Sequence, residues 1–137
     1  MPNAASDLQQ GLYQTLTGDT ELSGLLGANS VFDHFPNRAA HPYIVISRAT
    51  STDWSTSTED GLEHQITFHI WSKDRSRAEV NAIRSRVEVL LSDAQISLND
   101  NHLVNLTLEF AEARHDSESG YLHGIMRFRA VTEPVPA

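Results

Sequence analysis

The feature that most constrains the fold is a change in the period of the hydrophobic pattern along the second half of the chain. Apolar and polar residues alternate from Leu62 to Trp71, which predicts a half-buried strand because strand side chains point alternately to two faces. From Asp74 to Ser92 the period lengthens to that of a helix. Alternation returns over 103–112 and 121–132. This order predicts an α+β domain, with a mainly antiparallel sheet and one long helix packed on a face.

The same pattern predicts which side chains of the last two strands face the core. Over 103–112 we expect the alternate apolar residues to point inward. Over 121–132 one face is apolar and the other carries imidazole and guanidinium groups. The expected inward residues are Val104, Leu106, Leu108, Phe110, Leu122, Met126, Phe128 and Ala130, and the expected outward ones are His123, Arg127 and Arg129.

Two short helices are predicted at the start of the chain. Ser6 or Asp7 is the expected N-cap of the first helix, which Gly18 ends. Asp19 is the expected N-cap of the second, and Gly27 occupies the position where a glycine commonly ends a helix. The apolar face of the first helix is expected to carry Leu8, Leu12 and Leu16.

Short strands are expected over 31–35 and 43–48, which are rich in β-branched and aromatic residues. The stretch 49–61 consists mostly of Ser, Thr and Asp, so we expect a long loop or a hairpin arm. The whole then forms a single α+β domain over 1–133 in the order ααβββαββ. The Pro-containing residues 134–137 are expected to form an extended tail.

Composition excludes several classes of protein. The chain has 137 residues, no cysteine and a formal net charge of −8. Without cysteine there is no disulfide scaffold, no thiolate zinc site and no cysteine nucleophile. Negative charge disfavours adhesion to nucleic acid, because phosphate neutralisation supplies most non-specific affinity. The longest apolar run, Tyr43–Ile46, is far below the roughly 18 residues that span a bilayer, so we expect no membrane segment and a soluble protein.

No motif for catalysis or cofactor binding stands out. There is no nucleophile elbow and no phosphate-cradling glycine-rich loop, so we expect no cofactor. His64 and His69 are five residues apart on one strand and point to opposite faces, so they cannot share a metal ion. His115 and His123 flank a hairpin turn and are placed to meet, but no carboxylate lies at ligand spacing. We expect neither a metal site nor an enzyme.

The remaining signal is one of interaction. Between Ala49 and Ser72 there are four acidic residues and no Lys or Arg, and a basic stretch follows directly. Trp54 lies alone in the polar stretch, where it either folds back on the core or anchors a partner. Opposite charges of this kind pair within one chain or between subunits of a head-to-tail ring. The candidate interface residues are Asp53, Trp54, Glu59, Asp60, Arg77 and Arg84.

A series of short motifs, in order and spanning nearly the whole chain, carries a family resemblance. The motifs are Asp19-x-x-Leu22-x-x-Leu25-Leu26-Gly27, Val31-Phe32-Asp33-x-x-Pro36, Pro42-Tyr43-Ile44-Val45-Ile46, Asp53-Trp54-Ser55-Thr56-x-Thr58-x-x-Gly61-x-Glu63-His64, Thr67-x-His69-x-Trp71-Ser72, Arg77-Ala78-Glu79-Val80 and His123-Gly124-x-x-Arg127-Phe128-Arg129-Ala130. In these the sequence resembles the tail-completion or tail-terminator proteins of long-tailed, non-contractile phages and of phage-like gene transfer agents.

The resemblance implies a structural virion protein with an α+β fold and no active site. Such proteins form a ring, typically a hexamer, that stops polymerisation of the tail tube and joins it to the head connector. The implied partners are further copies of the chain, the tail-tube protein and the connector, with DNA passing through the channel unspecifically. The implied location is the tail end of a virion, after synthesis in the bacterial cytoplasm. A head–tail connector or minor tail protein is the alternative, and a small ligand-binding or enzymatic domain is the alternative of another class.

Overall fold

The computed structural model describes residues 4–27, 29–47, 49–58, 60–74, 76–93 and 96–134. Within them the strands join one sheet in the order β1-β2-β4-β6-β5, and β3 pairs with β4 beside this path. All pairings are antiparallel except that of β1 with β2. The elements are α1 Ala4–Thr17, α2 Thr20–Leu26, β1 Val31–Phe32, β2 Tyr43–Ile46, β3 Thr50–Asp53, β4 Leu62–Ser72, α3 Ala78–Asp93, β5 Asn101–His115 and β6 Leu122–Pro134.

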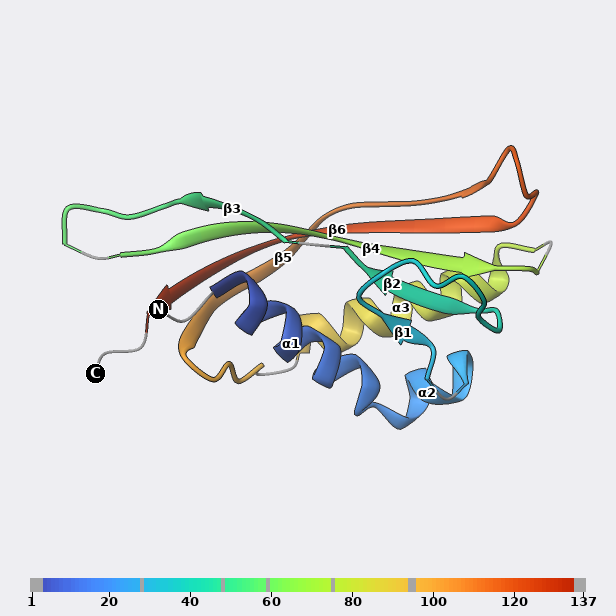
Figure 1. Cartoon of the computed structure of the whole chain (residues 1–137), viewed down its shortest axis with the longest axis horizontal. Helices are drawn as coiled ribbons and strands as arrows, with labels where there is room; N and C mark the ends of the chain where they lie inside the picture. Colours follow the sequence, from blue (N-terminus) through green and yellow to red (C-terminus); the bar gives the residue numbers. More distant parts are fainter. Residues whose placement is uncertain are drawn as a thin grey trace.

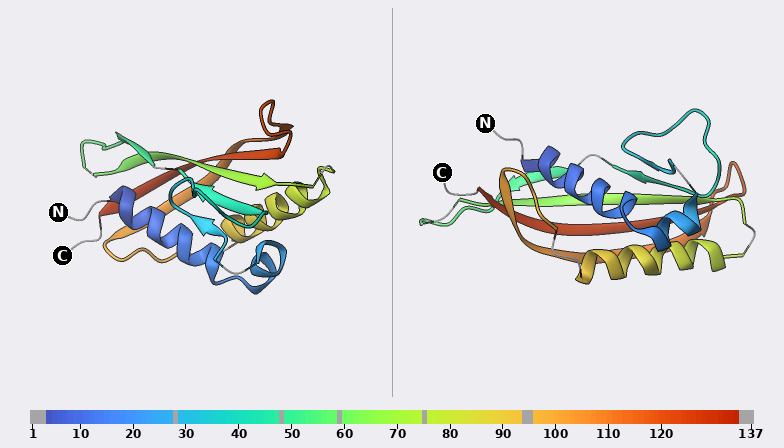
Figure 2. Two further views of the ribbon diagram at one scale, coloured as in Figure 1. Left: turned by 45° about the vertical axis from the view of Figure 1, so that its right-hand side comes forward. Right: turned by 90° about the horizontal axis from the view of Figure 1, so that it is seen from below.

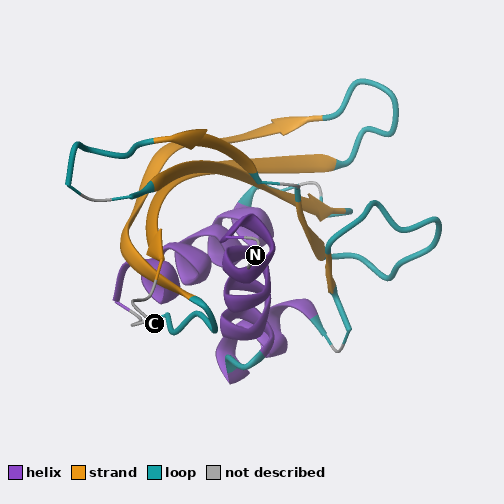
Figure 3. Ribbon diagram, turned by 60° about the vertical axis from the view of Figure 1, so that its left-hand side comes forward, coloured by secondary structure: helices purple, strands orange, loops and turns teal. Residues whose placement is uncertain are grey.

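The sheet curves over the helices, which all lie against its concave face (Figures 1 and 3). Figure 2 shows α1 and α3 side by side across this face, whereas the convex face carries no helix among the described residues. We call these the inner and the outer face of the sheet. The predicted α+β class, with a mainly antiparallel sheet and a long helix on one face, is therefore confirmed. No described helix is long and apolar enough to span a membrane.

The core lies between the inner face and the helices. The predicted leucine face of α1 is buried, as is the apolar stripe of α3 and the alternate residues of β4 and β6. Gly124 of β6 lets α3 approach closely, because a Cβ there would lie 2.7 Å from Val80 Cγ1. The largest buried side chains include Phe68, Leu8, Leu12, Leu16, Ile70, Ile83, Leu122 and Met126.

Helix α1 begins earlier than predicted, and Asp7 does not cap it. The Asp7 carboxylate is buried and accepts hydrogen bonds from Asn99 N–H and Asp100 N–H at 2.9 Å and from Asn101 Nδ2 at 3.0 Å. These bonds tie α1 to the segment before β5. Burial alone would raise the Asp7 pKa, but the bonds outweigh it and hold the pKa below its ordinary value.

The second helix matches its prediction. The Asp19 carboxylate accepts a hydrogen bond from Leu22 N–H at 2.8 Å, which is the geometry of an N-cap. Gly27 ends the helix at a φ of 90°, a conformation that favours glycine. Arg86 of α3 binds Asp19 through two nitrogens at 2.9 and 2.7 Å and Glu21 at 2.9 Å, so this basic residue holds α2 to α3.

The predicted facing of β5 is wrong at two positions. Val104 and Phe110 are 42% and 41% exposed instead of inward. The register of β5 against β6 shifts between Leu103 and Asn105 and again between Leu108 and Phe110. A β-bulge adds one residue to a strand and so reverses the alternation beyond it. Leu106 and Leu108 do pack against the core, as predicted.

Several boundaries also differ from prediction. The first strand keeps only Val31 and Phe32, and α3 begins at Ala78. Pro134, which was expected to start the extended tail, is the last residue of β6 and lies opposite Asn101. Residues 135–137 and Arg48 lie outside the described residues.

Candidate assembly interface

The stretch 49–61 is a hairpin arm built on an additional strand. Strand β3 pairs with the first half of β4, from Thr50 opposite Gln65 to Asp53 opposite Leu62. Thr and Ser fit this strand because every described residue from Thr50 to Asp60 is exposed. Figure 1 shows the arm reaching beyond the helices at one end of the molecule.

A buried histidine fixes the arm to the sheet. His64 Nδ1 lies 2.8 Å from Ser51 Oγ on β3, and His64 Nε2 lies 2.8 Å from Thr132 Oγ1 on β6. The imidazole is fully buried on the inner face, and this burial lowers the His64 pKa. The three side chains therefore connect three neighbouring strands at the root of the arm. Sequence reasoning placed His64 on a face but missed this contact, which depends on the register of β3.

Trp54 combines the two roles that the sequence left open. Its ring lies against Gly61 on the other side of the hairpin, where a Cβ would be 3.6 Å from Trp54 Cε3. The guanidinium carbon of Arg129 lies 5.8 Å from the centre of the ring, and Arg129 in turn binds Glu63 at 2.8 Å. Even so, Trp54 is 49% exposed. The residue is held at the base of the arm with half of its surface available to a partner.

The carboxylates of the arm have few partners. Asp53 Oδ1 accepts hydrogen bonds from Ser55 Oγ at 2.6 Å and from Ser55 N–H at 3.1 Å, and these lower the Asp53 pKa. Asp60 is exposed and forms no ion pair within 4.0 Å with any described residue. Glu59 lies outside the described residues. The arm therefore presents negative charge to its surroundings.

Of the predicted basic partners, Arg77 lies at the other end of the molecule, and Arg84 lies about 10 Å from it along α3, which runs back along the sheet (Figure 2). Arg77 stands directly before α3, where its Nε donates to the carbonyl of Ala113 at 3.4 Å, and Arg84 lies further along the same helix. Neither has a carboxylate within 4.0 Å among the described residues. Strand β4 runs from the arm to this end (Figure 1), and its ten steps of about 3.3 Å separate the two ends by about 33 Å. One chain cannot bring these charges together.

The imidazoles form no metal cluster. His64 lies on the inner face and His69 on the outer face, as predicted. His115 lies opposite Leu122 and therefore points to the inner face, away from His123. The expected meeting of His115 with His123 is thus wrong, and His123 instead bonds His69, with Nε2 2.8 Å from Nδ1. No group of three or more metal-ligating side chains occurs among the described residues.

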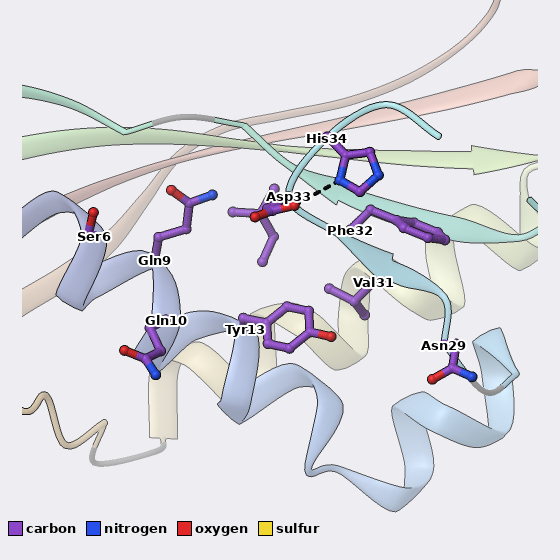
Figure 4. Close-up of a pocket in the computed structure, with 10 residues that line it drawn as sticks. Ser6, Gln9, Gln10, Tyr13, Asn29, Val31, Phe32, Asp33 and His34 are labelled. Atoms are coloured by element: carbon purple, nitrogen blue, oxygen red, sulfur yellow. Dashed lines mark hydrogen bonds and ion pairs between the residues drawn. The ribbon is translucent and has the colours of Figure 1, made fainter. Parts of the chain in front are cut away.

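A surface depression of about 490 Å³ between α1 and β1 is the site at which a small ligand would be sought. Its Asp33–His34 pair, 2.8 Å apart, is exposed. Figure 4 shows Ser6 and His34 at opposite ends of the depression with Gln9 between them.

Comparison with known proteins places these features in a family. The sequence profile of the family described as "Tail completion protein gp17" matches residues 10–133. The tail completion protein gp17 of Bacillus phage SPP1 is 30% identical over 89 residues, which cover 65% of this chain and 66% of that protein. A chain in the structure titled "Virion of native gene transfer agent (GTA) particle" superposes with a TM-score of 0.84 at 26% identity, over 96% of this chain and 99% of that one.

The solved structure of bacteriophage SPP1 gp17 shares the fold. It superposes with a TM-score of 0.64 at 24% identity, over 97% of this chain and 91% of that one. The profile match covers most of the chain and both superpositions span nearly all of it. The chain therefore belongs to the family of the tail completion protein gp17, whose members are structural proteins of virions and not enzymes.

Proposed function

We propose that this protein forms a ring that terminates the tail tube and joins it to the head connector. Membership of the tail completion family supports the tail location, and the likeness to a chain of a gene transfer agent particle supports a role within an assembled virion. Six copies are the expected number. The tail-tube protein and the connector are the expected partners, and DNA passes through the channel.

One observation carries the ring: the acidic arm lies far from Arg77 and Arg84, which have no carboxylate within 4.0 Å among the described residues. The separation of about 33 Å along β4 far exceeds the Debye length of about 8 Å at physiological ionic strength. Attraction between Asp53 or Asp60 and Arg77 or Arg84 is therefore effective only between two copies. Unlike surfaces at opposite ends produce head-to-tail contacts, which close into a ring when the rotation between subunits allows it.

The net charge suits a passage for DNA. Each copy carries −8, so six copies carry 6 × −8 = −48 in formal charge. Any part of this charge that lines the channel repels the phosphate backbone and prevents the ring from holding the DNA. A channel of this kind conducts DNA without binding it.

A charge exchange between subunits tests the head-to-tail contact. We expect Asp53→Lys with Asp60→Lys, and separately Arg77→Glu with Arg84→Glu, to impair assembly as measured by native mass. Mixing the two variants should restore assembly, because each then offers the other a complementary surface. Failure of the mixture to recover, with both variants folded, would refute this pairing.

The connector or minor tail alternative predicts a different association. A tail terminator should co-purify with tail tubes from particles that lack heads, whereas a connector should remain with the heads. Recovery with heads alone would favour the alternative.

A further inference from the structure

Three stacked rings and a fourth, tilted ring form a continuous cluster on the outer face of the sheet, at the end away from the arm. Trp71 and His123 are nearly parallel with centroids 4.0 Å apart, His123 stacks on His69 at 5.0 Å, and Phe35 contacts His69 at 5.5 Å. Trp71 lies directly opposite His123 in the β4–β6 register, and His69 is two residues earlier on the same face. We call Phe35, His69, Trp71 and His123 the ring stack. None of the described helices covers this face (Figure 1).

The ring stack is an uncharged aromatic surface. His69 Nδ1 and His123 Nε2 are 2.8 Å apart, a hydrogen bond in which one nitrogen donates and the other accepts. Burial keeps both imidazoles neutral at pH 7, because it disfavours the charged form. Phe35 is the most exposed large apolar side chain that the structure describes, at 60%. Aromatic rings exposed in this way are typical of protein interfaces.

Positive charge lies beside the stack without a carboxylate partner. Lys73 follows β4 directly, and its Nζ lies 5.5 Å from the centre of the Tyr121 ring. No carboxylate of a described residue lies within 4.0 Å of Lys73. Two carboxylates at this end accept hydrogen bonds, Asp116 from Ser119 and Asp74 from Ser76 N–H. Lys73, by contrast, contacts an aromatic ring and no carboxylate within 4.0 Å among the described residues.

We propose that the ring stack is the seat for the arm of a second copy, with Trp54 on the exposed ring of Phe35 and the arm carboxylates facing Lys73. The arm complements the ring stack in charge and in chemistry. It is acidic, has no Lys or Arg, and carries the half-exposed indole of Trp54. Trp and Tyr that dock on such surfaces commonly dominate the energy of an interface. The arm of the same chain cannot occupy the seat, because β4 separates the two by about 33 Å.

This inference rests on the head-to-tail ring and adds the surface that closes it. The pairing of the arm with Arg77 is compatible with the seat, since Arg77 stands where α3 begins, at the end of the molecule where β4 ends (Figure 1).

Cysteine trapping tests the seat directly, because the chain has no native cysteine. The double variant Trp54→Cys with Phe35→Cys is oxidised or treated with a short bismaleimide. It should give a series of covalent oligomers on a denaturing gel, and the largest should contain as many copies as the ring. An internal disulfide is excluded, since its Cα atoms must lie within about 7 Å. Trp54→Cys with Val89→Cys is the matched control, because Val89 is 46% exposed on α3 and should give monomer only.

The experiment distinguishes failure of the seat from failure of the ring. If the Trp54→Cys with Phe35→Cys variant forms a closed oligomer by native mass and no crosslink forms between its copies, the seat is refuted and the ring stands. If the wild type forms no oligomer with or without tail tubes, the ring and the seat both fail. As a second measurement, Phe35→Ala should raise the concentration for half-assembly by about tenfold, whereas Val89→Ala should leave it nearly unchanged. Equal effects of the two variants would also overturn the proposal.

Discussion

Acidification should destabilise the subunit through the imidazole pair of the ring stack. Burial, aided by the proximity of His69 and of the Arg114 guanidinium, lowers the pKa of His123 from its ordinary 6.5 to about 4. The folded state therefore binds this proton only at low pH, whereas the unfolded chain binds it near pH 6.5. Stability is fully present above pH 6.5 and falls as the pH drops toward 4, where the loss levels off.

The magnitude follows from the size of the shift. A difference of about 2.5 pKa units at about 1.36 kcal/mol per unit gives at most about 3 kcal/mol for His123. The His64 and His69 pKa values are lowered in the same direction by burial, so they add to the loss. Because a domain of this size is stable by roughly 5–15 kcal/mol, the effect is measurable without complete unfolding.

Urea unfolding at pH 7 and at pH 4.5 measures the effect. His123→Phe keeps a ring that stacks on Trp71 but has no proton to bind. We expect wild type to lose more free energy of unfolding between the two pH values than His123→Phe, by about 2–3 kcal/mol. An equal loss in both proteins would refute the assignment of a buried, neutral imidazole pair.

Two further predictions concern packing and the support of α1. Gly124→Ala should lower the free energy of unfolding by about 1–3 kcal/mol, measured by heat or urea, because its Cβ would lie 2.7 Å from Val80 Cγ1. Gly24→Ala should instead stabilise α2 by up to about 1 kcal/mol, because nothing lies within 4 Å of its Cβ. If Gly124→Ala were no more destabilising than Gly24→Ala, the close approach of α3 to β6 would be contradicted. Asp7→Ala should cost about 3 kcal/mol or more, since it leaves two backbone N–H groups and an amide at Asn101 without their acceptor, and proteolysis at 96–100 should speed up. Unchanged stability would show that Asp7 is solvated.

The secondary structure was predictable wherever a hydrophobic period persisted. The alternation of β4 and the helical stripe of α3 gave their positions and their buried faces, because burial on one face imposes the period on the sequence. The facing of β5 was not predictable, since each β-bulge reverses the alternation and no residue type marks it. Asp7 illustrates a second limit: an acidic residue near a helix start fits a cap, and only the fold shows that a distant segment binds it.

The candidate interface was partly predictable for a similar reason. The acidic arm and the basic stretch are contiguous in sequence, so their charge was visible. Their placement at opposite ends depends on β4 running the length of the sheet between them. The ring stack was not visible, because Phe35, His69 and His123 come from three segments that only the strand register brings together.

The central claim is that this chain stops growth of the tail tube, and electron microscopy of particles that lack it tests this most directly. Tails should then be uncapped, variable in length and detached from heads, and adding back the wild-type protein should restore a uniform length with a ring at the tail end. Tails of normal, uniform length joined to heads in its absence would contradict the account.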